Sequence, residues 1–261
     1  HYVMVEAQLP FIVALVVAIA ISLLIGLIVG FISLRIEGIY LVILTLALSE
    51  ILRTLYGAIE PKLALSAKNA VLFGKKLVAE RKYVFSYVKN TIEVSDCITN
   101  EGDKEEPVMI LYHCNMGYPL LSENSRVVIP NSGVCGRNDY AGANILTALE
   151  MEAPTGGYEE RCYYFDVEEK DGVAKAGIYN EDIEKGLVIS YDKNSLPYFT
   201  EWKMMGKTDY VLGLEPGNCT PDGRDVLRQK GLLEFVSPGA NKTTSLCFEF
   251  YDNKNKFEEV I

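Results

Sequence analysis

The apolar residues of this chain follow two different patterns, and the first is a run without charge. Residues 9–34 are 26 consecutive uncharged residues rich in Val, Ile, Leu and Ala, more than the roughly 20 that a helix needs to cross a bilayer core. Residues 38–49 form a second uncharged run, closed by Glu50 and Arg53 and marginal as a span on hydropathy alone. We expect the first run to be a transmembrane helix, with a shorter second span as an open alternative. A buried helix of a soluble protein is the competing interpretation.

Short alternating runs replace this pattern after residue 70. Ile92, Val94 and Ile98 share one side of a run, and residues 108–114 are a continuous apolar stretch typical of a central strand. Residues 162–179 predict a hairpin around Asp171 and Gly172. Further strands are predicted at residues 187–191, 210–214, 232–236 and 245–251. The series predicts a mainly β domain built as an antiparallel β-sandwich.

The change of pattern divides the chain into three predicted parts. Residues 1–60 form a membrane helical segment, residues 61–70 a join, and residues 71–261 a β-sandwich domain. Basic residues accumulate from Lys62 to Lys82, and the positive-inside tendency places that side of the membrane in the cytoplasm. Since the chain begins at His1 instead of Met, we expect a fragment or a processed product. A natural fusion and an assembly artefact both remain open as the origin of the join.

Composition narrows the possible partners. The chain carries a net charge of −10, nearly all of it after residue 59, which argues against nucleic acid and anionic surfaces and leaves neutral polar ligands open. Its six cysteines are widely spaced, with no CxxC pair and no pair of histidines beside them, so a metal site is not expected. We favour reduced thiols in a cytosolic β domain over disulfides.

The candidate chemistry rests on one histidine and one carboxylate. Apart from His1, His113 is the single histidine of the chain and lies at the end of a predicted strand, so imidazole proton transfer falls to it. Glu215 ends another apolar run and opens a loop of Pro, Gly, Asn and Asp. Structural roles for both residues stay open. A paired acid and base suits the opening and closing of a cyclic hemiacetal, and we expect the two groups to flank one sugar ring. The chain has no GxSxG, P-loop or GxGxxG motif for other chemistries.

The run from Arg35 to Arg53 carries a recognisable pattern at Arg35, Gly38, Tyr40, Leu41, Ile43, Thr45, Leu46 and Glu50. On these positions the first 60 residues resemble a membrane permease of branched-chain amino acid ABC transporters, of the LivM type. The resemblance implies a membrane location and, as an alternative function, a fragment of a permease that assembles with other transporter subunits. Glu50 is then an ionisable residue at membrane depth, or a helix-end carboxylate near Arg53.

Three ordered blocks carry a second resemblance, at residues 112–121, 196–206 and 209–224. Residues 71–261 are similar to the aldose 1-epimerase-like group of the galactose mutarotase superfamily, in particular its DUF4432-type branch. The resemblance implies a large antiparallel sandwich, a carbohydrate ligand and no cofactor. It implies His113 as the acid for the ring oxygen and Glu215 as the base for the anomeric hydroxyl. By position in the blocks it also places six residues in the sugar pocket: Asn115, Trp202, Lys203, Asn218, Asp222 and Arg224.

This resemblance also implies N-terminal strands in whose place the chain has another segment. Family members carry a longer N-terminal β region that supplies an Arg and a second His to the pocket, and here the permease-like segment stands instead. The prediction is therefore an incomplete sandwich that binds a small-molecule sugar and interconverts its anomers. A sugar-binding module without catalysis and the permease fragment remain the alternatives.

Overall fold

The computed structural model describes residues 62–70, 76–86 and 88–261, together with six isolated helical positions between residues 13 and 23. Apart from those six positions, both predicted spans and the permease-like segment lie outside the described residues. Over the part of the chain that is described, no helix combines the length and the hydropathy needed to cross a membrane. One compact unit of the chain comprises residues 63–84 and 89–261, and it contains the predicted β domain.

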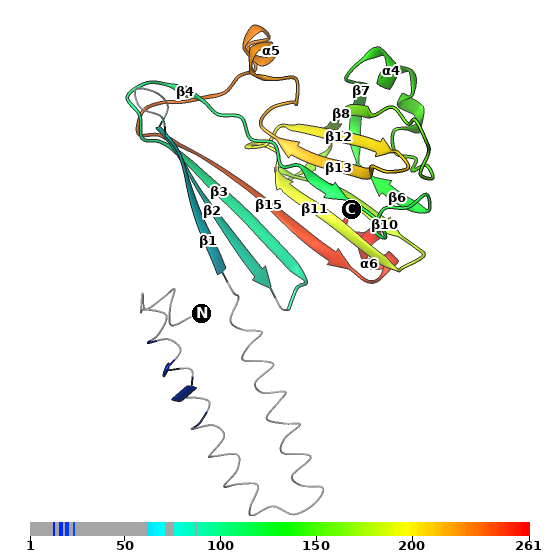
Figure 1. Cartoon of the computed structure of the whole chain (residues 1–261), viewed down its shortest axis with the longest axis horizontal. Helices are drawn as coiled ribbons and strands as arrows, with labels where there is room; N and C mark the ends of the chain where they lie inside the picture. The colour runs from blue at the N-terminus through cyan, green and yellow to red at the C-terminus, as the bar shows by residue number, and fades with distance from the viewer. Residues whose placement is uncertain are drawn as a thin grey trace, which may run out of the picture. The chain divides into compact units, whose positions relative to one another are not determined.

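Two antiparallel sheets make up this unit (Figure 1). The larger sheet contains β1 (Lys62–Ala70), β2 (Lys76–Ser86), β3 (Thr91–Asn100), β15 (Asn241–Tyr251), β11 (Lys185–Asp192), β10 (Val173–Asn180) and β6 (Ser125–Val128), in that order, with β9 (Glu169–Lys170) paired to β10. The smaller sheet contains β5 (Cys114–Met116), β13 (Tyr210–Gly217), β12 (Tyr198–Met205), β8 (Arg161–Val167) and β7 (Asn131–Gly136). A short pair joins β4 (Glu106–Pro107) to β14 (Phe235–Val236).

The main hydrophobic core lies between the two sheets. Ile189 and Leu246 of the larger sheet belong to the same buried cluster as Phe165, Phe199 and Leu214 of the smaller sheet. Side chains alternate between the two faces of a strand, so the neighbours of these residues point away from the core. The prediction of an antiparallel β-sandwich is confirmed.

Four short helical segments complete the fold: α4 (Asp139–Ala143), η1 (Ile145–Thr147), α5 (Arg224–Gln229) and α6 (Lys254–Val260). Helix α6 covers part of the larger sheet on the side opposite the main core. Its Phe257 is 1% exposed and packs with Tyr179 and Val188 in a second buried cluster. Tertiary packing therefore stabilises this short helix, which has no long helical period in the sequence.

Three predicted strand features differ in detail, and the first is residues 232–236, of which only Phe235 and Val236 form a strand. The apolar residues 108–114 do not form one continuous strand, because their backbone partners are irregular: Ile110 donates to the side chain of Asn218, while Tyr112 donates to the carbonyl of Pro216. The hairpin predicted over residues 162–179 is restricted to β9 and β10. Its first arm, β8, instead pairs with β7 and β12 in the other sheet. Asp171 and Gly172 do form the turn, both with positive φ.

The predicted join also has regular structure. Residues 62–70 form strand β1, which lies next to β2 at one edge of the larger sheet. The sheet therefore begins inside the segment that was expected to connect two domains. The three-part division of the chain stays a prediction, except that residues 62–70 of its middle part belong to the larger sheet.

Candidate functional site

The smaller sheet brings His113 and Glu215 together on one face. Leu212 and Leu214 of β13 point into the core, so Glu215 lies on the opposite face, which we call the outer face. His113 immediately precedes β5, and β5 pairs with β13 through Asn115 and Gly213. The Nε2 atom of His113 lies 3.0 Å from Oε1 of Glu215. Residues a hundred positions apart in the sequence are thus in direct contact.

This contact differs from the predicted arrangement, in which the two groups flank a sugar ring. A 3.0 Å separation leaves no room for a ring between them, so a ring would have to lie over the pair. That placement is chemically adequate, because the ring oxygen and the anomeric hydroxyl are bonded to the same carbon. An acid and a base that serve those two oxygens can therefore be neighbours.

A glycine makes space for the carboxylate of Glu215. An ideal Cβ on Gly213 would lie 2.3 Å from Oε1 of Glu215 and 3.3 Å from Cβ of Trp202. Gly213 and Glu215 are two positions apart on one strand, so both face outward. The side chain of Glu215 lies over the backbone of Gly213, where no side chain is in the way. Any larger residue at 213 would compete with the carboxylate for this space.

Burial sets the electrostatics of the pair. The Glu215 side chain is 2% exposed and that of His113 is 49% exposed. Burial raises the pKa of the Glu215 carboxyl above its ordinary value, and the nearby His113 opposes the rise. Oε1 of Glu215 accepts no hydrogen bond of regular geometry from the described residues, in spite of its short distance to Nε2. The carboxylate is therefore a poorly solvated group with spare capacity to accept a proton.

Asn115 and Trp202 hold the ring of His113 from two sides. Nδ1 of His113 lies 2.7 Å from Oδ1 of Asn115, so each ring nitrogen has an oxygen within hydrogen-bonding distance. The indole of Trp202 meets the imidazole edge-on, with ring centroids 5.4 Å apart, and its Nε1 donates to Glu160 over 2.8 Å. Both predicted pocket residues thus lie beside the candidate acid.

Asp222 joins a separate polar cluster near β8. Its Oδ1 accepts from the Tyr164 hydroxyl at 2.7 Å and from Nε of Arg137 at 3.3 Å, and its Oδ2 accepts from Thr220 at 3.1 Å. Partial burial disfavours its charge, but the hydrogen bonds from Tyr164 and Thr220 and the nearby cation of Lys230 together lower the pKa of Asp222. This predicted pocket residue is therefore an ionised acceptor that already has partners.

Three other predicted pocket residues do not join His113. Lys203 is fully buried on the core side of β12, where Nζ donates to the carbonyls of Thr147 and Glu150. Asn218 is 2% exposed and bonds to Val108, Ile110 and Glu234. Arg224 is exposed at the first position of α5. For Lys203 the physical reason is strand alternation, because position 203 has the same parity as the core residues Phe199 and Met205.

Sequence reasoning missed Thr200, Tyr164 and Arg137. Thr200 is fully buried on the outer face, and β-sheet register places it directly opposite Glu215 on one side and Tyr164 on the other. Alternation along β12 would have found Thr200 only with the core face of the strand known, and the sequence alone does not give that face. Tyr164 and Arg137 have no comparable signal, since their partner Asp222 is far away in the sequence.

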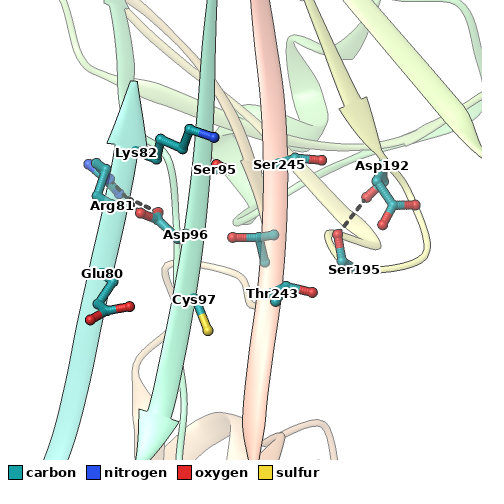
Figure 2. A pocket seen from close by; sticks show the side chains of 11 residues that line it. Glu80, Arg81, Lys82, Ser95, Asp96, Cys97, Asp192, Ser195, Thr243 and Ser245 are labelled. Carbon is teal, nitrogen blue, oxygen red and sulfur yellow. Dashed lines mark hydrogen bonds and ion pairs between the residues drawn. The ribbon is translucent and has the colours of Figure 1, made fainter. Parts of the chain in front are cut away.

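Among the cavities formed by the described residues, two lie near the surface of the sandwich without His113 or Glu215 in their lining. One of about 410 Å³ opens on the smaller sheet beside Tyr164 and Tyr198. The other, of about 560 Å³, lies along β2, β3 and β15 of the larger sheet, where Arg81 and Asp96 face one another (Figure 2). That pair is joined by two hydrogen bonds of 2.7 and 2.6 Å, so its charges are mutually satisfied.

The six cysteines are all free. Among the described residues, no group of three or more His, Cys, Asp or Glu side chains is arranged to hold a metal ion.

The fold is that of a galactose mutarotase-like β-sandwich, which solved structures share. Residues 60–250 match the model of the family described as "Domain of unknown function (DUF4432)". The chain belongs to that family. No curated protein matches it significantly in sequence.

Solved structures agree with the fold assignment. A protein of Klebsiella pneumoniae named as a candidate aldose 1-epimerase is 24% identical with a TM-score of 0.73, and the match covers 77% of this chain and 53% of that one. A galactose mutarotase-like protein of Clostridium acetobutylicum is 14% identical with a TM-score of 0.53, covering 73% and 62%. A candidate aldose 1-epimerase of Escherichia coli K12 is 15% identical with a TM-score of 0.51, covering 72% and 65%. The matched part of this chain thus spans about half to two thirds of the length of these relatives.

Proposed function

We propose that this chain binds a carbohydrate and interconverts its anomers by acid–base catalysis. The observation that carries the proposal is the 3.0 Å contact between His113 Nε2 and the buried carboxylate of Glu215. Further support comes from the fold, which is shared with structures named as candidate aldose 1-epimerases. An acid and a base in contact, in different surroundings, can exchange protons with a substrate at neutral pH.

The proposed reaction needs two proton transfers. His113 donates a proton to the ring oxygen while Glu215 takes the proton of the anomeric hydroxyl. The bond between the anomeric carbon and the ring oxygen breaks, and the open-chain aldehyde forms. Rotation next to the carbonyl and reversal of both transfers close the other anomer, so the protein returns to its starting protonation state. The raised pKa of Glu215 suits a group that must accept a proton and release it again.

Substrate access in this proposal requires His113 to move. The imidazole is half-exposed and Glu215 beneath it is almost fully buried. A sugar must therefore replace the direct contact between the two side chains with contacts of its own. The neighbouring Trp202 ring, edge-on to His113, offers an apolar face at the same position for one face of the sugar.

The burial of Glu215 also favours a second candidate function, a sugar-binding module without catalysis. A carboxylate with a 2% exposed side chain serves a structural role if His113 never moves aside. In that case binding is saturable and anomer interconversion proceeds at the rate measured in buffer alone.

The test measures anomer interconversion by polarimetry or NMR with the full-length chain over a panel of aldoses. We expect acceleration by the wild type and a loss of about 10²- to 10⁴-fold in His113→Ala and in Glu215→Gln. Glu93→Gln is the matched control, because Glu93 is exposed on β3 of the other sheet. Unfolding curves establish that the variants fold. No acceleration with any aldose, or rates unchanged in both variants, would refute the enzymatic proposal.

A further inference from the structure

The outer face of the smaller sheet continues beyond Glu215 as a row of side chains across four strands. Thr200 of β12 is opposite Glu215 of β13 and also opposite Tyr164 of β8. Tyr164 is in turn opposite Cys135 of β7. Neighbouring strands are roughly 4.8 Å apart, so Tyr164 lies about 10 Å from Glu215 along this row.

A parallel row lies two residues further along each strand. Tyr198 of β12 is opposite Gly217 of β13. Because Phe199 pairs with Phe165, antiparallel register places Tyr198 opposite Asp166 on the other side. Asp166 is opposite Gly133 of β7. Both rows face away from the core, and Tyr198 and Tyr164 are therefore diagonal neighbours on one surface.

The cavity of about 410 Å³ occupies this surface. Its outward-facing lining comes from Tyr164, Tyr198, Asp166, Cys135 and Thr220. Its volume lies within the range of small-molecule sites, about 300–1,000 Å³. A lining that combines two aromatic rings with hydroxyl and carboxylate groups suits a ligand that is apolar on its face and polar at its edge, as a pyranose ring is.

Thr200 connects this cavity with the candidate catalytic pair. Its side-chain hydroxyl is buried and has no hydrogen-bond partner among the described residues, and Oε1 of Glu215 beside it in the row lacks a regular one. Buried polar atoms without partners are uncommon, and a bound ligand or water is one of the ordinary explanations. The two orphaned atoms belong to directly opposed residues between the cavity and the candidate catalytic pair, and each has the capacity to accept a hydrogen bond from a ligand or a water.

We propose that the cavity beside Tyr164 and Tyr198 is a second sugar subsite, and that the ligand is a disaccharide whose reducing ring lies at His113 and Glu215. This inference rests on the proposed function, because it takes the position of the first ring from the catalytic pair. The anomeric carbon of the first ring must stay free to open. The second ring is therefore attached through another carbon of the first ring, and the bond between the rings is not cleaved.

The test compares glucose with its 4-O-linked disaccharides maltose and cellobiose, using the full-length chain. Binding is measured by saturation-transfer NMR titration and interconversion by polarimetry. We expect at least one of the two disaccharides to bind on the order of tenfold more tightly than glucose. In Tyr198→Ala the tighter binding of the disaccharide disappears, while the affinity for glucose is unaffected. Tyr198→Phe retains the tighter binding because the aromatic ring remains. Phe250→Ala, an exposed aromatic residue of β15, is the control outside the cavity.

The outcomes separate this inference from the function on which it rests. Wild type that binds glucose and both disaccharides equally would overturn the second subsite, whether or not anomers interconvert. A Tyr198→Ala variant in which the binding of glucose and the binding of the disaccharide weaken to the same extent would also overturn the second subsite, because Tyr198 would then support the whole sheet. Tighter disaccharide binding, lost selectively in Tyr198→Ala, without interconversion of any sugar would support the subsite and refute the catalytic proposal.

Discussion

Gly213→Ala tests the geometry of the candidate site most directly. An added Cβ would lie 2.3 Å from Oε1 of Glu215, whereas ordinary van der Waals contact begins at 3.4 Å. The carboxylate must therefore move by about 1 Å or more. It has little free space to do so, because the side chain is 2% exposed and His113 lies 3.0 Å away. A catalytic group misplaced by about 1 Å costs on the order of 10²-fold in rate.

The same substitution also has a predicted effect on stability. Overpacking of a buried site costs about 1–3 kcal/mol, so the free energy of unfolding in urea should fall by that amount. The activity measurement is the rate of anomer interconversion at saturating sugar, at a temperature well below the unfolding midpoint. Gly156→Ala is the control, since nothing lies within 4 Å of a Cβ at this exposed position. We expect its rate and stability to match the wild type.

Two results would refute this reasoning in different ways. Full stability and full activity in Gly213→Ala would show that the Glu215 carboxylate does not occupy the space above the glycine. Reduced stability with an unchanged rate at saturation would confirm the packing but exclude Glu215 as the base.

Three further predictions follow from the charged groups. Interconversion should fall as the pH drops through the pKa of Glu215, because the base must be ionised. Since burial raises this pKa, the acid limb of a pH–rate profile should lie above pH 4.5, the ordinary value, and a limb below it would contradict the assignment. Burial raises the pKa of Glu201 to about 8, so the folded protein binds a proton that the unfolded chain releases at lower pH, and stability should decline as pH rises toward 8. Glu201→Leu should remove this dependence and add on the order of 3 kcal/mol at pH 7, whereas an unchanged pH profile of urea unfolding would show that Glu201 has another partner. Lys203→Met should lower the free energy of unfolding by roughly 2 kcal/mol, because it strips the Thr147 and Glu150 carbonyls of a donor. Lys203→Met should leave the KM for sugar unchanged. A raised KM in a variant as stable as the wild type would show that Lys203 contacts the sugar.

The period of two in the sequence was sufficient to predict the sandwich but insufficient to assign its faces. Both alternating sets of residues 199–205 mix polar and apolar side chains: Thr200 with Trp202 and Met204 in one, Glu201 and Lys203 with Phe199 and Met205 in the other. Nothing local says which set meets the second sheet. For this reason the sequence did not show that Lys203 lies on the core side of β12, and Thr200 was missed for the same reason.

Asn218 illustrates a different limit. Its place in a loop of Pro, Gly, Asn and Asp suited a ligand contact, but the structure uses it to replace a backbone partner for residues 108–110. That role depends on a segment over a hundred positions away. The irregular path of residues 108–114 has the same origin, since an apolar run takes regular strand form only where a regular partner runs beside it.

The sequence by itself determined that residues after 70 form a mainly β domain, and it singled out His113 and Glu215 as a candidate acid–base pair, whose separate roles were implied by the family resemblance. These conclusions rest on local alternation, on turn residues such as Asp171 and Gly172, and on the rarity of histidine, none of which needs a partner in space. The tertiary structure alone decided that the two groups touch, that Gly213 provides the room for the carboxylate, and that Thr200 and Tyr164 extend the same surface. Those facts depend on which strands are neighbours and in what register, and pairing between strands far apart in sequence is set by the packing of the whole core.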